Sequence, residues 1–142
     1  MPAGPVPSEF QGLLESRAFA FVSTLGKEGA PQVNPIWFTW DGQNVLISLM
    51  KGSQKYVNLQ RDNRIAVAIA HPSDPYRYLE LRGTARIEPD AGNEVFTAIS
   101  TKYTGSAFSL EPPDNVRYVA RIEVERYTAQ TDVTPPVIPD QE

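Results

Sequence analysis

Apolar and polar residues alternate along several stretches of this chain, and each stretch has the length of one or more β-strands. The stretches are 19–25, 32–40, 45–49, 76–88 and 116–130. A period of two puts successive side chains on opposite faces of a sheet, so each stretch predicts a strand. A sixth stretch, 65–70 (IAVAIA), holds only small and branched apolar residues and predicts a strand buried on both faces.

Turn-forming residues separate these strands and predict how they pair. The sequence GKEGAP at 26–31 is a hairpin connection between 19–25 and 32–40. Asp41-Gly42 is a tight-turn signal, which predicts that 32–40 pairs antiparallel with 45–49. Pro35 lies inside the second strand and cannot donate a backbone hydrogen bond, so the strand is predicted to be an edge strand or to bulge there.

Three short segments carry helical signals instead. Ser8 opens SEFQGLLESR, where Ser8 and Gln11 have capping-box spacing. Asp90 is predicted to cap a helix that runs through Tyr103. The apolar stripe of this last helix is predicted to face the core and consists of Val95, Phe96, Ile99 and Tyr103.

The remaining helix follows a glycine turn, KGSQK, directly after the strand 45–49. Ser53 is the predicted N-cap. The helix side that faces the sheet is predicted to carry Tyr56, Val57 and Leu59. Six or so largely antiparallel strands with three short helices predict an α+β protein that is mainly β, built as a partly open β-barrel with helices at its ends.

Length and composition set the organisation of the chain. Its 142 residues, 41% hydrophobic and 21% charged, predict one globular domain over residues 8–131. The proline- and glycine-rich start at 1–7 and the tail at 132–142 are predicted to be disordered. No apolar run is long enough to span a bilayer and no signal-peptide pattern is present, so a cytoplasmic protein without membrane contact is predicted.

Charge and residue usage exclude several kinds of chemistry. The chain has no cysteine and one histidine, His71, in the loop HPSDP, so no Cys/His metal site and no thiolate chemistry are predicted. The sequence contains no nucleophile-elbow motif such as G-x-S-x-G, so His71 is not predicted to act in nucleophilic catalysis. The net charge of −4 argues against a nucleic-acid partner.

The turn KGSQK carries the strongest local chemical signal. The start of a helix has partial positive charge and unpaired N–H groups, so Lys55 at that position is unfavourable unless an anion binds there. Lys51, Ser53 and Lys55 around Gly52 therefore describe a phosphate cradle. The other interpretation is a solvated basic turn, and the residues alone weigh the two about equally.

Four segments in this order resemble one known family. They are GKEGAPQVNPIWFTWDG, GSQKYVNLQRDNRIAVAI, DPYRYLELRGTARI and VARIEVERYTA. Together they resemble the split β-barrel flavin-binding proteins typified by pyridoxamine-phosphate oxidase. Within that family they are most similar to the small single-domain group of deazaflavin (coenzyme F420)-dependent reductases. The resemblance covers residues from about Phe10 to Thr128.

The resemblance implies which residues bind the cofactor. Its phosphate would lie at Ser53, Gln54 and Lys55. Several family members carry arginine at the position of Ser53, so phosphate binding here would either be weaker or depend more on Lys51. The ring would lie along one strand and contact the next, at Asn34, Pro35, Ile36, Trp37, Ser48 and Leu49. Backbone groups near Pro35 would bond the pyrimidine edge of the ring.

The resemblance also implies a homodimer with the cofactor at the subunit interface. Arg77 and Tyr78 would contact the cofactor of the partner subunit. From the residues alone, the polar face that contains Tyr78 fits ordinary sheet packing equally well.

The implied activity is hydride transfer from C5 of the reduced deazaflavin to an unsaturated small molecule. No side chain is required as an acid or base, and Tyr78 or solvent would deliver the proton. Trp37 and Trp40 offer flat surfaces that suit a planar substrate, although tryptophans in a sheet more often simply pack in the core. Two alternatives remain: an FMN-dependent oxidase or electron-transfer protein of the same fold, and a non-catalytic flavin- or haem-binding module. Haem is disfavoured because His71 is the sole histidine.

Overall fold

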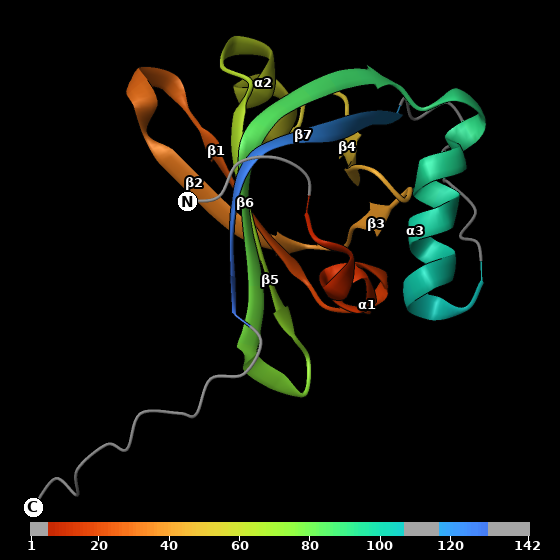
Figure 1. Cartoon of the computed structure of the whole chain (residues 1–142). Coiled ribbons are helices and arrows are strands. Elements are labelled where there is room, and N and C mark those ends of the chain that lie inside the picture. The colour runs from red at the N-terminus through yellow and green to blue at the C-terminus, as the bar shows by residue number, and fades with distance from the viewer. Residues whose placement is uncertain (1–5, 107–116, 131–142) are drawn as a thin grey trace, which may run out of the picture.

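Seven β-strands form one sheet in this computed structural model, which describes residues 6–106 and 117–130 (Figure 1). The strands are β1 (Ala20–Leu25), β2 (Pro31–Ile36), β3 (Thr39–Trp40), β4 (Val45–Met50), β5 (Arg64–His71), β6 (Asp74–Pro89) and β7 (Arg117–Gln130). Three α-helices accompany them: α1 (Gln11–Glu15), α2 (Gln54–Arg61) and α3 (Glu94–Thr104). The expectations of disorder for 1–5 and 132–142 lie outside the described residues.

The sheet has the order β2-β1-β5-β6-β7-β4-β3, and each of these neighbouring pairs is antiparallel. β2 and β3 stand at the two ends of this order although Trp37 and Phe38 alone separate them in the chain. The sheet therefore curls until its ends approach each other, without β2 pairing to β3. This is the predicted split β-barrel.

The prediction that residues 32–40 form a single strand is wrong. Residues 31–36 pair with β1, and Thr39 and Trp40 pair with β4, so the hairpin at Asp41-Gly42 involves β3 alone. The break has a physical cause: Phe38 turns into the core, where its exposed fraction is 0%. Pro35 lies on the edge strand β2, as its missing N–H predicted.

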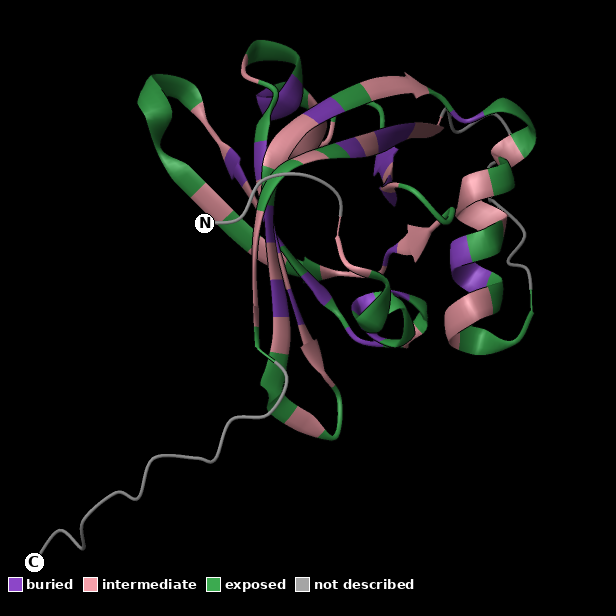
Figure 2. Ribbon diagram, viewed as in Figure 1, coloured by how far each residue is buried: buried purple, intermediate pink, exposed green. Residues whose placement is uncertain are grey.

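The core lies inside the curled sheet, and Figure 2 marks the buried residues along the strands and helices. Leu13 and Leu14 of α1 and Leu59 of α2 join apolar side chains from β1, β4, β5, β6 and β7 in a single cluster. The predicted capping box of the first helix does not form, because Pro7 precedes a short 3₁₀ turn at Ser8–Phe10 and no side chain caps it. Among the described residues, no helix has the length and apolar character needed to cross a membrane.

β6 is 16 residues long and pairs on both sides, which requires it to bend. The register with β7 shifts between Arg82 and Gly83, the mark of a β-bulge. A Cβ at Gly83 would lie 1.9 Å from the carbonyl oxygen of Glu123. The absence of a side chain therefore permits the close approach of the two strands.

We predict that Gly83→Ala destabilises the protein by about 1–3 kcal/mol, because the added methyl group forces β6 and β7 apart. Chemical denaturation followed by circular dichroism measures the change. Gly12→Ala is the matched control, since a Cβ there has nothing within 4 Å, and we expect it to be neutral or stabilising. Equal stability of the two variants would show that the bulge tolerates a side chain.

Candidate functional site

The turn between β4 and α2 has the geometry that the sequence predicted. Gly52 adopts φ +83°, a left-handed conformation that favours glycine. Ser53 is the N-cap of α2, and its hydroxyl accepts a hydrogen bond from the N–H of Tyr56 at 3.4 Å. The Ser53 N–H donates to the carbonyl of Met50 at 3.0 Å, which closes the turn.

Two lysines flank this turn in different environments. Lys51 is exposed, whereas Lys55 is partly buried, and this burial lowers the pKa of Lys55 from its ordinary value. Within the described residues neither lysine forms an ion pair. The start of α2 therefore carries uncompensated positive charge that an anion would neutralise.

A buried polar network fixes α2 against the sheet. Asn58 is fully buried; its amide nitrogen donates to Thr24 Oγ1 at 3.0 Å and to Gln32 Oε1 at 3.1 Å. Gln54 Nε2 donates to Asn58 Oδ1 at 2.7 Å. The prediction that Val57 faces the sheet is wrong: Val57 is 40% exposed, and Asn58 takes the inward position instead.

A cleft of about 340 Å³ opens beside the gap in the barrel, where α3 packs against β3 and β4, and residues at the end of β2 contribute to its lining. Its lining is mostly apolar and aromatic and consists of Phe19, Pro35, Ile36, Trp37, Ser48, Phe96, Ile99 and Arg117. Four predicted site residues thus meet in one cleft, namely Pro35, Ile36, Trp37 and Ser48. Phe19, Phe96, Ile99 and Arg117 were not in the predicted set.

Helix α3 forms one wall of the cleft and is tied down at both ends. The carboxylate of Asp90 accepts hydrogen bonds from the N–H groups of Val95 and Phe96, both at 3.0 Å. The predicted hydrogen bonds from Asp90 to the helix start are therefore present, but the N-cap residue of α3 is Asn93, and Asp90 lies before it in the chain. At the other end, the hydroxyl of Tyr103 donates to the carbonyl of Ala18.

Aromatic stacking extends the floor of the cleft. The rings of Trp37 and Tyr103 are stacked with centroids 4.8 Å apart and an interplanar angle of 2°. Burial raises the pKa of Tyr103, which keeps its hydroxyl a neutral donor. Trp37 is therefore held in place between the barrel gap and α3, as a positioned flat surface must be.

Lys102 connects α3 to the point where the chain leaves β2. Its ammonium group donates to the carbonyl of Phe38 at 3.1 Å and to that of Leu14 at 3.4 Å. It also lies 3.7 Å from the centroid of the Phe38 ring. Burial lowers the pKa of Lys102 to about 8, and the negative charge of Glu15 opposes this shift.

Within the part of the chain that the structure describes, three buried side-chain atoms near these elements have no hydrogen-bond partner: Asn34 Oδ1, Ser48 Oγ and Arg117 Nε. Two of them belong to residues that line the cleft. A buried polar atom without a partner costs free energy, so unpaired atoms in a cleft indicate a bound group that completes them. Asn34 and Ser48 were both predicted to contact a ring.

The other predicted residues lie elsewhere. The side chain of Leu49 packs in the core, so its backbone alone remains for a ligand. Arg77 is exposed and Tyr78 half-buried near the β5–β6 hairpin, and neither lines the cleft of its own chain.

Strand β4 connects the cleft to the basic turn. It ends at Met50, and Lys51 and Gly52 alone separate Met50 from Ser53. Within the described residues no three metal-binding side chains converge.

These features define a class of protein: a split β-barrel whose open seam holds an aromatic cleft, with a cationic helix start at the end of the strand that lines it. The chain belongs to the pyridoxamine 5'-phosphate oxidase family, which it matches over residues 6–131.

Individual relatives narrow the comparison. The chain is 26% identical to the F420H(2)-dependent biliverdin reductase of Mycobacterium tuberculosis (strain CDC 1551 / Oshkosh) over 122 residues, 84% of this chain and 85% of that protein. A solved structure named F420 reductase is 30% identical, superposes with a TM-score of 0.77 and is matched over 88% of this chain and 100% of its own. HupZ of Group A Streptococcus, 21% identical with a TM-score of 0.63 over 86% of this chain and 91% of its own, shares the fold.

We predict that Asn58→Ala lowers the free energy of unfolding by about 1–3 kcal/mol, because Thr24, Gln32 and Gln54 lose their common partner inside the protein. Thermal denaturation measures the loss. Gln60→Ala on the exposed side of the same helix is the control and should change stability little. If both variants have the melting temperature of the parent protein, the network does not anchor α2.

Proposed function

We propose that this protein is an oxidoreductase that uses reduced coenzyme F420 to transfer a hydride to an unsaturated small molecule. One observation carries the proposal: a cleft with unpaired polar atoms lies along the strand that leads into an uncompensated cationic helix start. A planar ring joined to a phosphate satisfies both ends of this arrangement. The names of two relatives, an F420H(2)-dependent biliverdin reductase and an F420 reductase, support the choice of coenzyme.

The phosphate of the coenzyme is proposed to bind at Ser53, Gln54 and Lys55, with Lys51 beside it. The free N–H groups at the start of α2 and the ammonium of Lys55 would supply hydrogen bonds and charge. Lys55 is already partly desolvated, so little water has to leave before it contacts an anion. The Asn58 network keeps this helix start in position relative to β1 and β2.

The ring is proposed to lie along Asn34, Pro35, Ile36 and Trp37, next to Ser48 and the backbone of Leu49. The side-chain amide oxygen of Asn34 and the hydroxyl oxygen of Ser48 are the unpaired groups that would accept hydrogen bonds from its polar edge, which leaves the O–H of Ser48 free to donate. When bound, the reduced deazaflavin supplies a hydride from its C5 position. Trp37, Phe96 and Ile99 would orient the acceptor and exclude water from it.

No side chain of the cleft is positioned as an obvious acid. Solvent is one proton source for the proposed reduction. Tyr78 is the other, and it would reach the cleft only from a second copy of the chain, because it does not line the cleft of its own.

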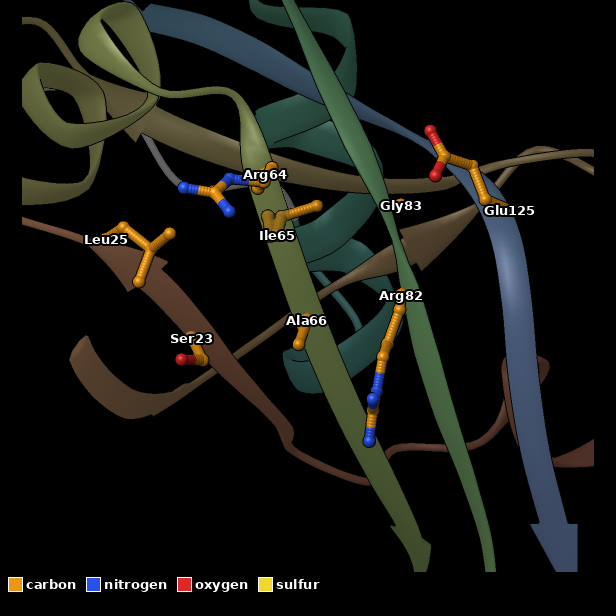
Figure 3. A pocket seen from close by; sticks show the side chains of 8 residues that line it. All are labelled: Ser23, Leu25, Arg64, Ile65, Ala66, Arg82, Gly83 and Glu125. Carbon is orange, nitrogen blue, oxygen red and sulfur yellow. The ribbon is translucent and has the colours of Figure 1, made fainter. Parts of the chain in front are cut away.

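A homodimer is part of the proposal, with Arg77 and Tyr78 facing the cofactor of the partner. The outer face of β1, β5 and β6 supports it: Phe21 is 46% exposed there, and a shallow hollow of about 500 Å³ lies on the same side. Figure 3 shows Ser23, Ala66 and Arg82 at this hollow, on the strands β1, β5 and β6, which are neighbours in the sheet. Small side chains beside an exposed aromatic one suit contact with a second sheet.

FMN is the second candidate coenzyme. The family name is that of an oxidase, and FMN presents a ring and a phosphate with the same spacing to the same turn. With FMN the protein would act as an oxidase or reductase, or bind the flavin without catalysis. The cytoplasmic location remains a prediction.

A screen for reduction of quinones, unsaturated lactones and bilins would identify the class of molecule that accepts the hydride.

We predict that the purified protein binds coenzyme F420, measured by polarisation of the coenzyme's own fluorescence. Lys55→Ala should weaken binding about 10- to 100-fold, since a charge-assisted hydrogen bond contributes about 1.5–3 kcal/mol. Lys27→Ala, in the exposed β1–β2 turn, is the control and should bind like the parent. Co-purification of FMN with no F420 signal at high protein concentration would assign the site to the flavin.

The pH dependence gives an additional readout for Lys55. Burial lowers its pKa in the free protein, and an anion binds the protonated form. Affinity should therefore fall as the pH rises through this lowered pKa, below the ordinary value of 10.5. Lys55→Arg stays protonated throughout and should lack this decline.

We predict a mass of twice 15.8 kDa by light scattering, because the exposed face around Phe21 is proposed to be buried between two subunits. Phe21→Glu should yield monomers, since it places a charge in an apolar contact. Val57→Glu, at another exposed apolar position, should leave the mass unchanged. The mass of a single chain at every concentration would contradict the shared site.

A further inference from the structure

Arg117 differs from four other arginines of the sheet in having no ion pair within the described residues, and from the exposed Arg77, which also has none, in the burial of its Nε. Arg64, Arg82, Arg86 and Arg121 each pair with a carboxylate. Arg117 has no ion pair within the described residues, and its buried Nε has no hydrogen-bond partner. A guanidinium with a desolvated, unpaired N–H is unfavourable unless an anion binds it.

The surroundings of Arg117 determine what kind of anion fits. The guanidinium carbon lies 4.4 Å from the ring centroid of Phe96, and both residues line the cleft. Phe96 stabilises the cation and holds it at the wall. Trp37, Ile36 and Ile99 complete an apolar surface around it. These surroundings suit an anion that is attached to a flat apolar body.

A second donor lies close to Arg117 on the neighbouring strand. Met50 of β4 is opposite Arg117 of β7, and Ser48 is opposite Val119. Ser48 and Arg117 are therefore diagonal neighbours on one face of the sheet, a separation of roughly 7–8 Å between backbones that side chains bridge through a shared ligand. The Ser48 hydroxyl is also buried without a partner. A carboxylate has two oxygens to accept from the two groups.

We propose that Arg117 and Ser48 form an anion-binding site on the wall of the cleft, and that its occupant is a carboxylate carried by the hydride acceptor. The assignment to the acceptor rests on the proposed function, which places the phosphate of the coenzyme at the α2 turn. The substrate class is then a planar, conjugated carboxylic acid. Arg117 is a specificity-determining residue that orients the acid, and it does not take part in hydride transfer.

Calorimetric titration of the protein without coenzyme tests the anion site itself. The probes are 2-naphthoate and uncharged 2-naphthamide, which share one ring system. We expect naphthoate to bind at least tenfold more tightly than naphthamide. Arg117→Met should abolish this preference, and Arg86→Met, which removes an exposed arginine, should preserve it. Equal affinity for the two probes, no saturable naphthoate binding, or a preference that survives in Arg117→Met would overturn the proposal.

A second titration separates the two sources of the anion. F420 affinity should change less than twofold in Arg117→Met; a loss of tenfold or more would give the site to an anionic group of the coenzyme and overturn the assignment to the acceptor. Arg117→Lys keeps the positive charge and should retain part of the preference for naphthoate. This control shows whether the Met variant loses the preference because the charge is missing or because the protein is misfolded. Because the naphthoate experiment contains no coenzyme, a protein that prefers FMN would still show the Arg117 effect.

Discussion

The crossing of the chain from β2 to β3 at Trp37 and Phe38 is the constraint on which the rest of the structure depends. These two residues connect the opposite ends of a seven-stranded sheet. Phe38 takes the inner side of the crossing and is fully buried. Trp37 takes the side of the cleft and stacks on Tyr103 of α3. The barrel cannot close by strand pairing at this point, and its seam therefore becomes a cleft with positioned aromatic walls.

The second requirement is that a cationic helix start be held beside that cleft. Positive charge at a helix N-terminus is unfavourable by itself, so α2 needs support from elsewhere. Asn58 provides it through hydrogen bonds to the first two strands, and Leu59 adds apolar contact with the core. The fold thus stabilises a local arrangement that the isolated segment would not favour, which is common at binding sites.

Much of this architecture is predictable from the sequence because it follows local rules. Alternation locates the strands, and the missing N–H of Pro35 indicates the edge position of β2. Glycine and serine in KGSQK indicate the start of α2. The inward position of Asn58 was missed because a helical stripe is read from apolar residues, and a buried amide whose partners lie on distant strands leaves no local signal.

The cleft is less predictable because α3 creates it through contacts far apart in the chain. Period-two alternation tells that Arg117 and Val119 share a face of their strand, but not that this strand pairs with β4 beside Ser48 or that α3 covers that face. The burial of the Leu49 side chain in the core was likewise not predictable from the sequence. Both faces of β4 are apolar, so the sequence does not tell which one points into the core.

Lys102 has a consequence for how this protein tolerates change over evolution. It holds α1, the crossing and α3 together mainly through the carbonyl oxygens of Leu14 and Phe38, which any residue at those positions would offer. The lysine and the Phe38 ring beneath its ammonium group are therefore the restrictive members of the junction, while the carbonyl acceptor at Leu14 does not depend on the identity of its side chain. Lineages that reshape the wall of the cleft for new acceptors can vary the neighbouring side chains and still keep α3 attached, provided that a cation persists at position 102.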